Sequence, residues 1–267
     1  MFNNIIYFPH SLGQQREGVD KTPEIIDKFI NNNSNRMWVK TNPDNFYKNI
    51  ENLYRLNRQY LSPKINIGGD HSMAIATVAE SLEQDPNVKV LWFDAHPDIN
   101  TYEMSNSKNY HGMPLSFLTG LDTDSNFPFL KQKLPFENLL YIGIRDIDIF
   151  EEYILNEYNI QYISCFDLNK DTATAIKAID NFIGDSLIHI SFDVDCLDPK
   201  YMSCTGTSVG EGLELKIVKF LIDSLYLNYK DCILNIDITE LNLELGTKEE
   251  QFLSLANTLS IFEKFLK

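Results

Sequence analysis

The segment VKVLWFDAHPD, residues 88–98, decides the fold, because it joins a continuous apolar run to a cluster of acids and a histidine. The segment IHISFDVD, residues 188–195, has the same organisation, and INIGGDHS, residues 65–72, ends in a third polar cluster. Apolar runs without polar alternation are typical of strands that are covered on both faces, which favours a parallel sheet. Ligands of such sheets bind beyond the carboxyl ends of the strands, and all three clusters fall there.

Outward from these segments, short apolar runs alternate with stretches of helical periodicity. This alternation predicts a doubly wound α/β fold in a single domain, residues 1–267. Strands are expected at residues 4–8, 64–67, 89–93, 139–143, 161–164, 187–192 and 232–236. Helices are expected at residues 23–31, 43–61 (with Asn42 as its cap), 72–83, 172–183, 214–225 and 247–265. Residues 121–137 are expected to form a long surface loop.

Composition excludes several classes of partner. The formal net charge of −15 argues against nucleic acid and anionic membranes, which require a basic face. Four cysteines without a CxxC pair suggest free thiols in a reducing compartment. The N-terminus lacks the basic flank and apolar run of a signal peptide, and no apolar run is long enough to span a bilayer. We therefore expect a soluble, cytoplasmic protein.

The polar clusters combine carboxylates with imidazoles at short spacing. Side chains at i, i+2 and i+4 of an extended segment share one face, which places Asp94, His96 and Asp98 together. Asp193 and Asp195 would share a face in the same way. The four crowded carboxylates would raise one another's pKa values, and two divalent cations would neutralise their mutual repulsion. Mixed carboxylate and imidazole ligands suit Mn²⁺, with Fe²⁺, Co²⁺ or Zn²⁺ as alternatives. The candidate ligands are His71, Asp94, His96, Asp98, Asp193 and Asp195.

Each of these residues also has an ordinary structural interpretation. A lone Asp after a strand is usually a helix cap or turn residue, and a lone His is usually a hydrogen-bonded core or surface residue. We assign Asp70 and Asp198 to that class. Three clusters that each follow their own strand are much harder to explain in this way. The sequence therefore favours a binuclear metal site.

Seven motifs in fixed order carry a family resemblance. These residues resemble the ureohydrolase family, which holds arginases, agmatinases and formimidoylglutamases. The start of the chain, GQQREGVDKTPEII at residues 13–26, is also similar to the family's N-terminal segment. The motifs are GGDHS (68–72), DAHPDINT (94–101), SKNYHGMP (107–114), GIRDID (143–148), SFDVDCLDP (191–199), TGT (205–207) and DITELN (237–242).

The resemblance implies an arginase-like fold and a binuclear manganese centre. The fold would be a three-layer α/β/α sandwich with a mainly parallel sheet of about eight strands, and the chains would assemble as trimers or hexamers. One metal would be held by His71, Asp94, Asp98 and Asp193, and the other by Asp94, His96, Asp193 and Asp195. Asp94 and Asp193 would bridge the two ions.

The resemblance also implies a mechanism, in which a metal-bridging hydroxide attacks the guanidinium carbon of the substrate. Asp98 would donate a proton to the departing amine. His111 would exchange protons with solvent; otherwise it is a hydrogen-bonding residue of the pocket wall. Glu240 would pair with the guanidinium; otherwise it is an acid at a helix N-terminus. Thr207 matches a residue near the same end of the substrate.

The far end of the substrate distinguishes arginine from agmatine, because only arginine carries an α-carboxylate. Asn100, Ser105 and Ser107 match the family's neutral donors for that carboxylate, and Asp148 and Glu151 match the acids that face the α-ammonium. Alone, each has an ordinary interpretation as a loop residue. Together they favour L-arginine as substrate, with L-ornithine and urea as products.

Three residues depart from the family pattern beside the expected site. Pro97 replaces a Thr, Cys196 replaces a Gly, and Lys108 stands where arginases often have Gly. Each departure leaves the metal ligands in place. Lys108 is expected at the pocket mouth, where it would influence substrate preference.

Three alternatives stay open from the sequence. The first is an agmatinase or another amidinohydrolase with the same chemistry. The second is a formimidoylglutamase, for which Arg145 is the one candidate to receive the extra carboxylate. The third is an inactive protein of this fold that binds arginine or another protein.

Overall fold

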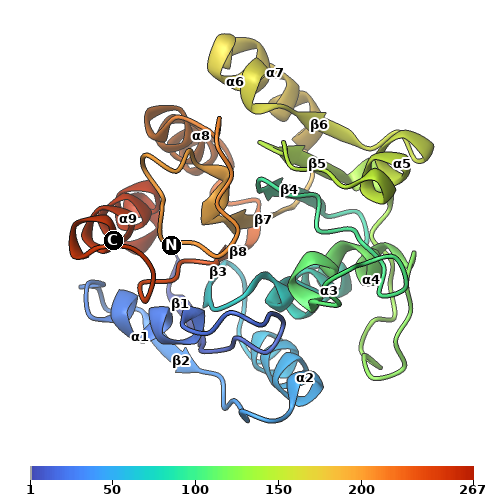
Figure 1. Cartoon of the computed structure of the whole chain (residues 1–267), viewed down its shortest axis with the longest axis horizontal. Coiled ribbons are helices and arrows are strands. Elements are labelled where there is room, and N and C mark those ends of the chain that lie inside the picture. The colour runs from blue at the N-terminus through green and yellow to red at the C-terminus, as the bar shows by residue number, and fades with distance from the viewer. Residues whose placement is uncertain (1) are drawn as a thin grey trace.

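An eight-stranded sheet forms the centre of the computed structural model, which describes residues 2–267 (Figure 1). The strand order is β2-β1-β3-β8-β7-β4-β5-β6, and every neighbouring pair is parallel. The expected α/β class with a mainly parallel sheet is therefore confirmed. The strands are β1 (Asn4–Phe8), β2 (Asn35–Trp38), β3 (Lys64–Gly68), β4 (Lys89–Phe93), β5 (Leu139–Ile142), β6 (Gln161–Ile163), β7 (Ile188–Asp193) and β8 (Ile233–Thr239).

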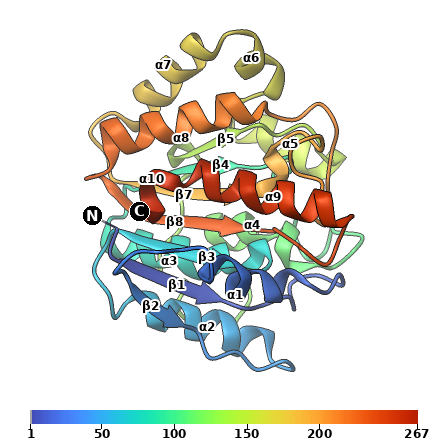
Figure 2. The same ribbon diagram turned by 90° about the vertical axis from the view of Figure 1, so that its left-hand side faces the viewer.

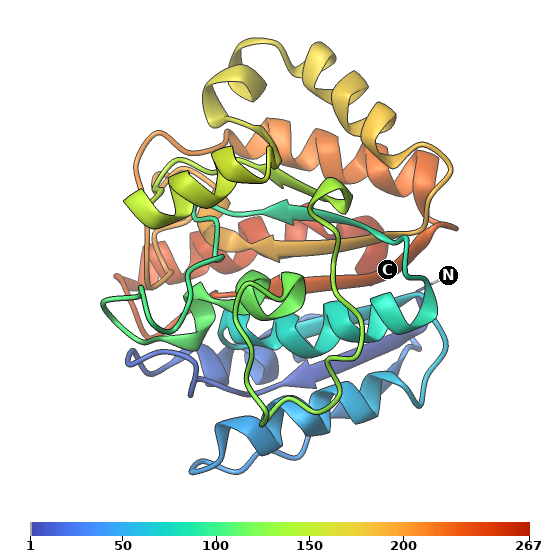
Figure 3. The same ribbon diagram turned by 90° about the vertical axis from the view of Figure 1, so that its right-hand side faces the viewer.

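Helices cover both faces of this sheet and complete the three layers. One face packs against α1 (Thr22–Asp27), α6 (Cys165–Lys170), α7 (Thr172–Ile183), α8 (Leu215–Tyr229), α9 (Lys248–Ile261) and α10 (Glu263–Leu266), and Figure 2 shows α1, α8 and α9 in front of it. The other face packs against α2 (Phe46–Asn57), α3 (Ala74–Gln84), α4 (Pro114–Thr119) and α5 (Ile149–Glu157), seen from the opposite side in Figure 3. Among residues 2–267, no helix is both long and apolar enough to cross a bilayer.

The differences from the expected elements have local causes. Asn45 caps α2, since its side chain accepts the amide of Lys48 at 2.9 Å. Asn42, the expected cap, accepts the amide of Asp44 in the preceding turn. Strand β2 was not expected, because as an edge strand it buries only Met37. Three further helices were not expected: α4 and α6, with six residues each, and α5, with nine. All three are too short to show a clear period.

The expected long loop is present, but its core is apolar. Between residues 121 and 135 the chain forms no helix or strand, and a short 3₁₀ helix, Phe136–Asn138, ends it. Phe127, Phe129 and Leu134 are nevertheless buried. The ring of Phe129 stacks on Tyr54 of α2 at 4.5 Å between centroids. The loop is therefore a packed cover for α2 and α4.

Candidate metal centre and substrate pocket

The carboxyl ends of four adjacent strands supply the candidate site. Asp193 is the last residue of β7, and Asp94 directly follows β4. His71 follows β3 on a short 3₁₀ helix, His71–Met73, and Glu240 follows β8. Because β3, β8, β7 and β4 are consecutive in the sheet, these residues meet at one edge. The placement that the sequence predicted for the polar clusters is therefore present.

The first group of candidate ligand atoms surrounds the ring of His71. Its Nδ1 lies 3.1 Å from Asp94 Oδ2, 3.0 Å from Asp98 Oδ2 and 3.4 Å from Asp193 Oδ2. Although it is buried among three oxygens, Nδ1 has no hydrogen-bond partner of good geometry. Donor atoms that face a common point, rather than one another, are what a shared cation requires.

The second group surrounds His96 and shares Asp94 with the first. His96 Nδ1 lies 3.1 Å from Asp195 Oδ2 and 3.4 Å from Asp94 Oδ1. Within each group, His71–Asp94–Asp193 and Asp94–His96–Asp195, ligand atoms lie within 4.8 Å of one another. Asp94 belongs to both groups, as a bridging ligand must. Asp193, the second expected bridge, belongs to the first group alone.

Turns rather than extended backbone bring these side chains together. Residues 94–98 lie outside any strand, and Asp98 has a left-handed φ of 48°. Asp94 and Asp193 each accept an amide two residues ahead, from His96 at 2.7 Å and from Asp195 at 2.8 Å. The expected proximity of Asp94, His96 and Asp98 is present, but a turn rather than an extended segment produces it. The chain bends after each strand, and a carboxylate that accepts a backbone amide stabilises each bend.

The charges of the cluster conflict with one another. Burial raises the pKa of Asp193 well above its usual range, and the charges of Asp195 and Asp94 raise it further. Burial and the charge of Asp94 raise the pKa of Asp98 to about 7. Burial also acts to raise the pKa of Asp94, but its contacts with His71 and His96 outweigh that and lower it. The site therefore favours a reduced negative charge, which bound cations would supply.

Neighbouring side chains orient the ring of His71, and one acid lies near that of His96. The Nε2 atom of His71 lies 2.8 Å from Ser191 Oγ, and its ring stacks on Trp92 at 4.2 Å between centroids. The Nε2 atom of His96 lies 3.6 Å from Asp146 Oδ2. Sequence reasoning missed Ser191, Trp92 and Asp146. The sequence could have indicated Ser191, because a residue two positions before Asp193 lies on the same face of the strand.

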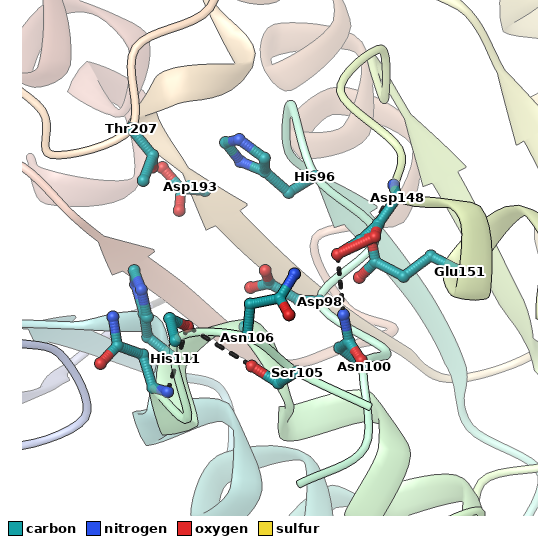
Figure 4. A pocket seen from close by; sticks show the side chains of 13 residues that line it. His96, Asp98, Asn100, Ser105, Asn106, His111, Asp148, Glu151, Asp193 and Thr207 are labelled. Carbon is teal, nitrogen blue, oxygen red and sulfur yellow. Dashed lines mark hydrogen bonds between the residues drawn. The ribbon is translucent and has the colours of Figure 1, made fainter. Parts of the chain in front are cut away.

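A pocket of about 290 Å³ opens onto the metal centre. Figure 4 shows side chains that converge on it from several loops. All six expected substrate contacts line it, and so do Asp98 and His111; Asn106, Asn109 and Gly112 line it without having been expected. The six are Asn100, Ser105, Ser107, Asp148, Glu151 and Thr207.

At one end of the pocket, two acids are tied to neighbouring backbone and amide groups. Asn100 Nδ2 donates to Asp148 Oδ2 at 2.9 Å, and the buried Asn100 Oδ1 has no partner (Figure 4). Glu151 accepts the amides of Asp148 at 3.2 Å and Ile99 at 3.3 Å, which closes a capping box at the start of α5. Burial raises the pKa of Glu151 to about 8, although these amides act to lower it. Asp148 is thus the more available acid.

Glu240 lies behind His111 rather than on the pocket wall, and only 1% of it is exposed. Its Oε1 accepts the amide of His71 at 2.8 Å and contacts His111 Nδ1 at 3.1 Å. Its Oε2 accepts from Gln14 Nε2 at 2.7 Å. Burial acts to lower the pKa of His111, but Glu240 raises it to about 9. Gln14 was missed as a contact, because nothing in its local sequence points to Glu240, 226 residues away.

Arg145 has a structural role behind the loop that carries Asp195. Its guanidinium donates to six carbonyl oxygens, among them Asp195 O at 2.8 Å and Val209 O at 2.8 Å. These bonds join the loop that carries Asp195 to the loop that carries Thr207. With its donors used in this way, Arg145 is not available to receive a substrate carboxylate. The feature that would have suggested a formimidoylglutamase is therefore explained by folding.

The three departures from the family pattern are accommodated without a change in the ligand cluster. The carbonyl of Pro97 accepts the hydroxyl of Tyr141 at 2.8 Å. Cys196 is buried, and its carbonyl accepts from Arg145 at 3.3 Å. Lys108 does not line the pocket, because its Nζ bonds to backbone carbonyls of its own loop. All four cysteines are free thiols.

Comparison with known proteins gives a consistent result. The family model described as the arginase family matches residues 5–262. The chain is similar to an arginase of Neurospora crassa, 39% identical over 198 residues, which are 70% of this chain and 55% of that protein. It is also similar to an arginase of Entamoeba histolytica, 31% identical over 256 residues, which are 84% of each chain.

The fold agrees with these matches. The crystal structure of the Entamoeba histolytica arginase in complex with L-ornithine superposes with a TM-score of 0.88 at 27% identity. That superposition covers 99% of this chain and 98% of the other.

Proposed function

The chain belongs to the arginase family, and we propose that it hydrolyses L-arginine to L-ornithine and urea at a centre of two manganese ions. Members of this family are hydrolases that act on a guanidino carbon–nitrogen bond. The observation that carries the proposal is the pocket itself. Its one end reaches the metal centre, and its lining also presents neutral donors and acids that match the two charges of an α-amino acid.

The donors of the metal centre fit two divalent cations. Four carboxylates and two neutral imidazoles carry a formal charge of about −4, which two such ions balance. The unpartnered His71 Nδ1 amid three carboxylate oxygens supports the same conclusion. When bound, the ions supply a water of lowered pKa as the nucleophile for the guanidinium carbon. Oxygen and imidazole ligands without thiolates favour Mn²⁺ and admit Fe²⁺, Co²⁺ or Zn²⁺.

In this proposal, Asp98 moves a proton between the nucleophile and the departing amine. Its Oδ2 lies 3.0 Å from His71 Nδ1, and the Asp98 side chain also lines the pocket. One carboxylate oxygen can therefore belong to the metal centre while the other reaches the substrate. Asp98 takes the proton of the attacking water and gives it to the amine nitrogen as the carbon–nitrogen bond breaks.

Glu240 and His111 act on the guanidinium as a pair. A carboxylate offers about four lone pairs, and the contacts with His71, His111 and Gln14 occupy three of them. His111 also covers Glu240 on the pocket side. We infer that the ring of His111 moves aside as the substrate enters. The Glu240 carboxylate is then available to orient the guanidinium, and the imidazole can exchange its proton with solvent.

The α-amino acid end of the substrate meets mixed polar groups. Ser105 and Ser107 donate to the α-carboxylate, together with the amide of Asn100. Asp148, the more available of the two acids, pairs with the α-ammonium, and Glu151 holds the loop beneath it. Neutral donors suit this carboxylate, because a row of cations would repel the guanidinium at the other end.

The test is a parallel assay of two guanidines. The purified chain is stripped of metal with a chelator, reloaded with Mn²⁺, and assayed for urea from L-arginine and from agmatine. We expect urea from L-arginine, little from agmatine, and none without metal. Turnover of agmatine alone would contradict the assignments of Asn100, Ser105 and Ser107. Stoichiometric metal without turnover of either compound would favour a binding protein.

A further inference from the structure

Lys108 is the one departure from the family pattern that lies in the carboxylate loop, residues 100–109. We propose that Lys108 is a positioning residue that holds this loop so that Ser105 and Ser107 present their hydroxyl protons to an α-carboxylate. This inference rests on the proposed function, because it concerns the recognition of the same substrate. It assigns a task to a side chain that does not itself line the pocket.

The backbone at Lys108 sets the orientation of both serines. Lys108 has a left-handed φ of 58°, a conformation that is unfavourable for a residue with a Cβ. In this conformation its amide donates to Ser105 Oγ at 3.1 Å, and the next amide, of Asn109, donates to Ser107 Oγ at 3.3 Å. Each hydroxyl oxygen thus accepts a backbone bond, and each proton can be donated. The two hydroxyls also contact each other at 3.4 Å, a long contact that a substrate carboxylate would replace.

The side chain of Lys108 offsets the cost of this conformation. Its Nζ donates to the carbonyls of Tyr102 at 2.5 Å and Glu103 at 3.0 Å. It also lies 5.1 Å from the centroid of the Tyr102 ring. These contacts connect the two ends of the loop across Ser105. A glycine would adopt the same φ at no cost, but it would not supply this connection.

The loop is fixed at its start by other contacts, so that Lys108 completes a frame. The amide of Ser105 donates to Thr101 O at 2.9 Å, and the amide of Tyr102 donates to Asp122 Oδ2 at 2.7 Å. At the other end, the Lys108 side chain connects the segment back to Tyr102 and Glu103, beside the backbone bond from Asn100 N to Gly112 O at 3.3 Å. The ammonium group also adds a positive charge to the loop that carries Ser105 and Ser107, at Tyr102 and Glu103. That charge favours an approaching carboxylate.

The test measures KM and kcat separately for Lys108→Met and Lys108→Arg. Lys108→Met keeps the length of the side chain and removes the charge and the donors. We expect its KM for L-arginine, and its inhibition constant for L-ornithine, to rise about 5- to 10-fold, which corresponds to about 1 kcal/mol. The kcat should stay within about twofold, because no group of the metal centre changes. Lys108→Arg should restore most of the affinity.

Controls separate a positioning role from a general structural one. Lys131→Met changes an exposed lysine of the neighbouring loop, and it should leave all constants and the melting temperature unchanged. An unchanged KM in Lys108→Met, with active wild-type enzyme, would overturn the inference while the proposed function stands. A fall in kcat and melting temperature that Lys108→Arg does not reverse would overturn it as well.

A direct measurement of L-arginine binding tests the role of Lys108 if the wild-type protein is inactive. If the wild type releases no urea, the proposed function fails, and calorimetric titration with L-arginine then decides on Lys108. Weaker binding by Lys108→Met than by the wild type supports the inference. Equal binding, or no binding by either protein, contradicts it.

Discussion

The two faces of strands β3, β7 and β8 bury opposite kinds of side chain. Toward α8 and α9 these strands place aliphatic and aromatic residues, such as Ile65, Phe192 and Ile236, in a continuous apolar core. Toward α3 the same strands place polar residues that are equally buried. The polar residues are Lys64, Asn66, His189, Ser191, Asn235 and Asp237.

Partners inside the protein satisfy most of this polar layer. Lys64 Nζ lies 2.7 Å from Glu80 Oε1 of α3, and Asn235 donates to the other oxygen of Glu80 at 2.9 Å. Asp237 accepts from Asn66 at 2.9 Å and contacts His189 Nε2 at 3.0 Å. At the carboxyl end the same face of β7 continues through Ser191, which contacts His71, to Asp193.

The two faces of the sheet contribute to the stability of the protein in different ways. The apolar face stabilises the fold in proportion to the area that it removes from water. Each group of the polar face costs free energy on burial unless it is hydrogen-bonded, so this layer is sensitive to the loss of any one partner. In return it fixes the direction of side chains that lead to the metal centre. We therefore expect mutations on the two faces to differ in both size and kind of effect.

The largest effect is expected where the polar face meets the metal centre. Asp193→Asn should lower kcat/KM for L-arginine about 1000-fold or more, because it removes a charged candidate ligand. The metal-free protein should not lose stability, since the change removes one of several mutually repelling carboxylates. Urea assays, elemental analysis and thermal unfolding without metal measure these effects. Asp231→Asn, at an exposed position, is the matched control.

The next effect is expected from breaking the buried ion pair of the polar face. Lys64→Met should lower the free energy of unfolding by about 3 kcal/mol, because Glu80 is left charged and buried. Urea denaturation measures the change. The double variant Lys64→Met, Glu80→Gln should recover much of the loss, since no unpaired charge remains. Equal stability of the single and double variants would show that packing, rather than charge, matters at this position.

A smaller effect is expected at Asp237, in the middle of the polar layer. Asp237→Asn keeps the shape but turns one acceptor oxygen into a donor that faces Asn66, Thr77 or His189. We expect a loss of about 2 kcal/mol in the free energy of unfolding, the cost of an unsatisfied buried group. Denaturation followed by tryptophan fluorescence, which reports on Trp92 near the same face, provides the measurement. No loss at all would mean that the layer rearranges easily.

The same contrast explains what the sequence could predict. Seven of the eight strands were expected within a few residues, because a run such as VLWF is apolar whichever face it covers. Strands β7 and β8 extend further than their apolar runs predict. Asp193 and Asp237 end those runs, but both residues still belong to the strands. Strand β2 and the short helices were missed because their patterns are too brief to show a period.

The site was more predictable in its members than in its geometry. Motifs alone named the six candidate ligands and the six candidate substrate contacts. All six candidate contacts line one pocket, together with the candidate ligands His96, Asp98 and Asp193. Their mutual contacts depend on chain segments far apart in sequence, so the sequence did not predict them. Gln14 contacts Glu240 across 226 positions, and Asn66 contacts Asp237 across 171. Tertiary packing, rather than local pattern, sets those distances.

The smallest effect is expected on the apolar face, at the residue beside Asp237. Ile236→Val removes one buried methylene group and should cost about 1 kcal/mol in the free energy of unfolding. The KM and kcat for L-arginine should not change, because Ile236 belongs to the apolar core and does not line the pocket. If activity fell together with stability, the two faces would be coupled through β8 itself. The independence of the apolar core from the metal centre would then be wrong, although each face would keep its own kind of stabilisation.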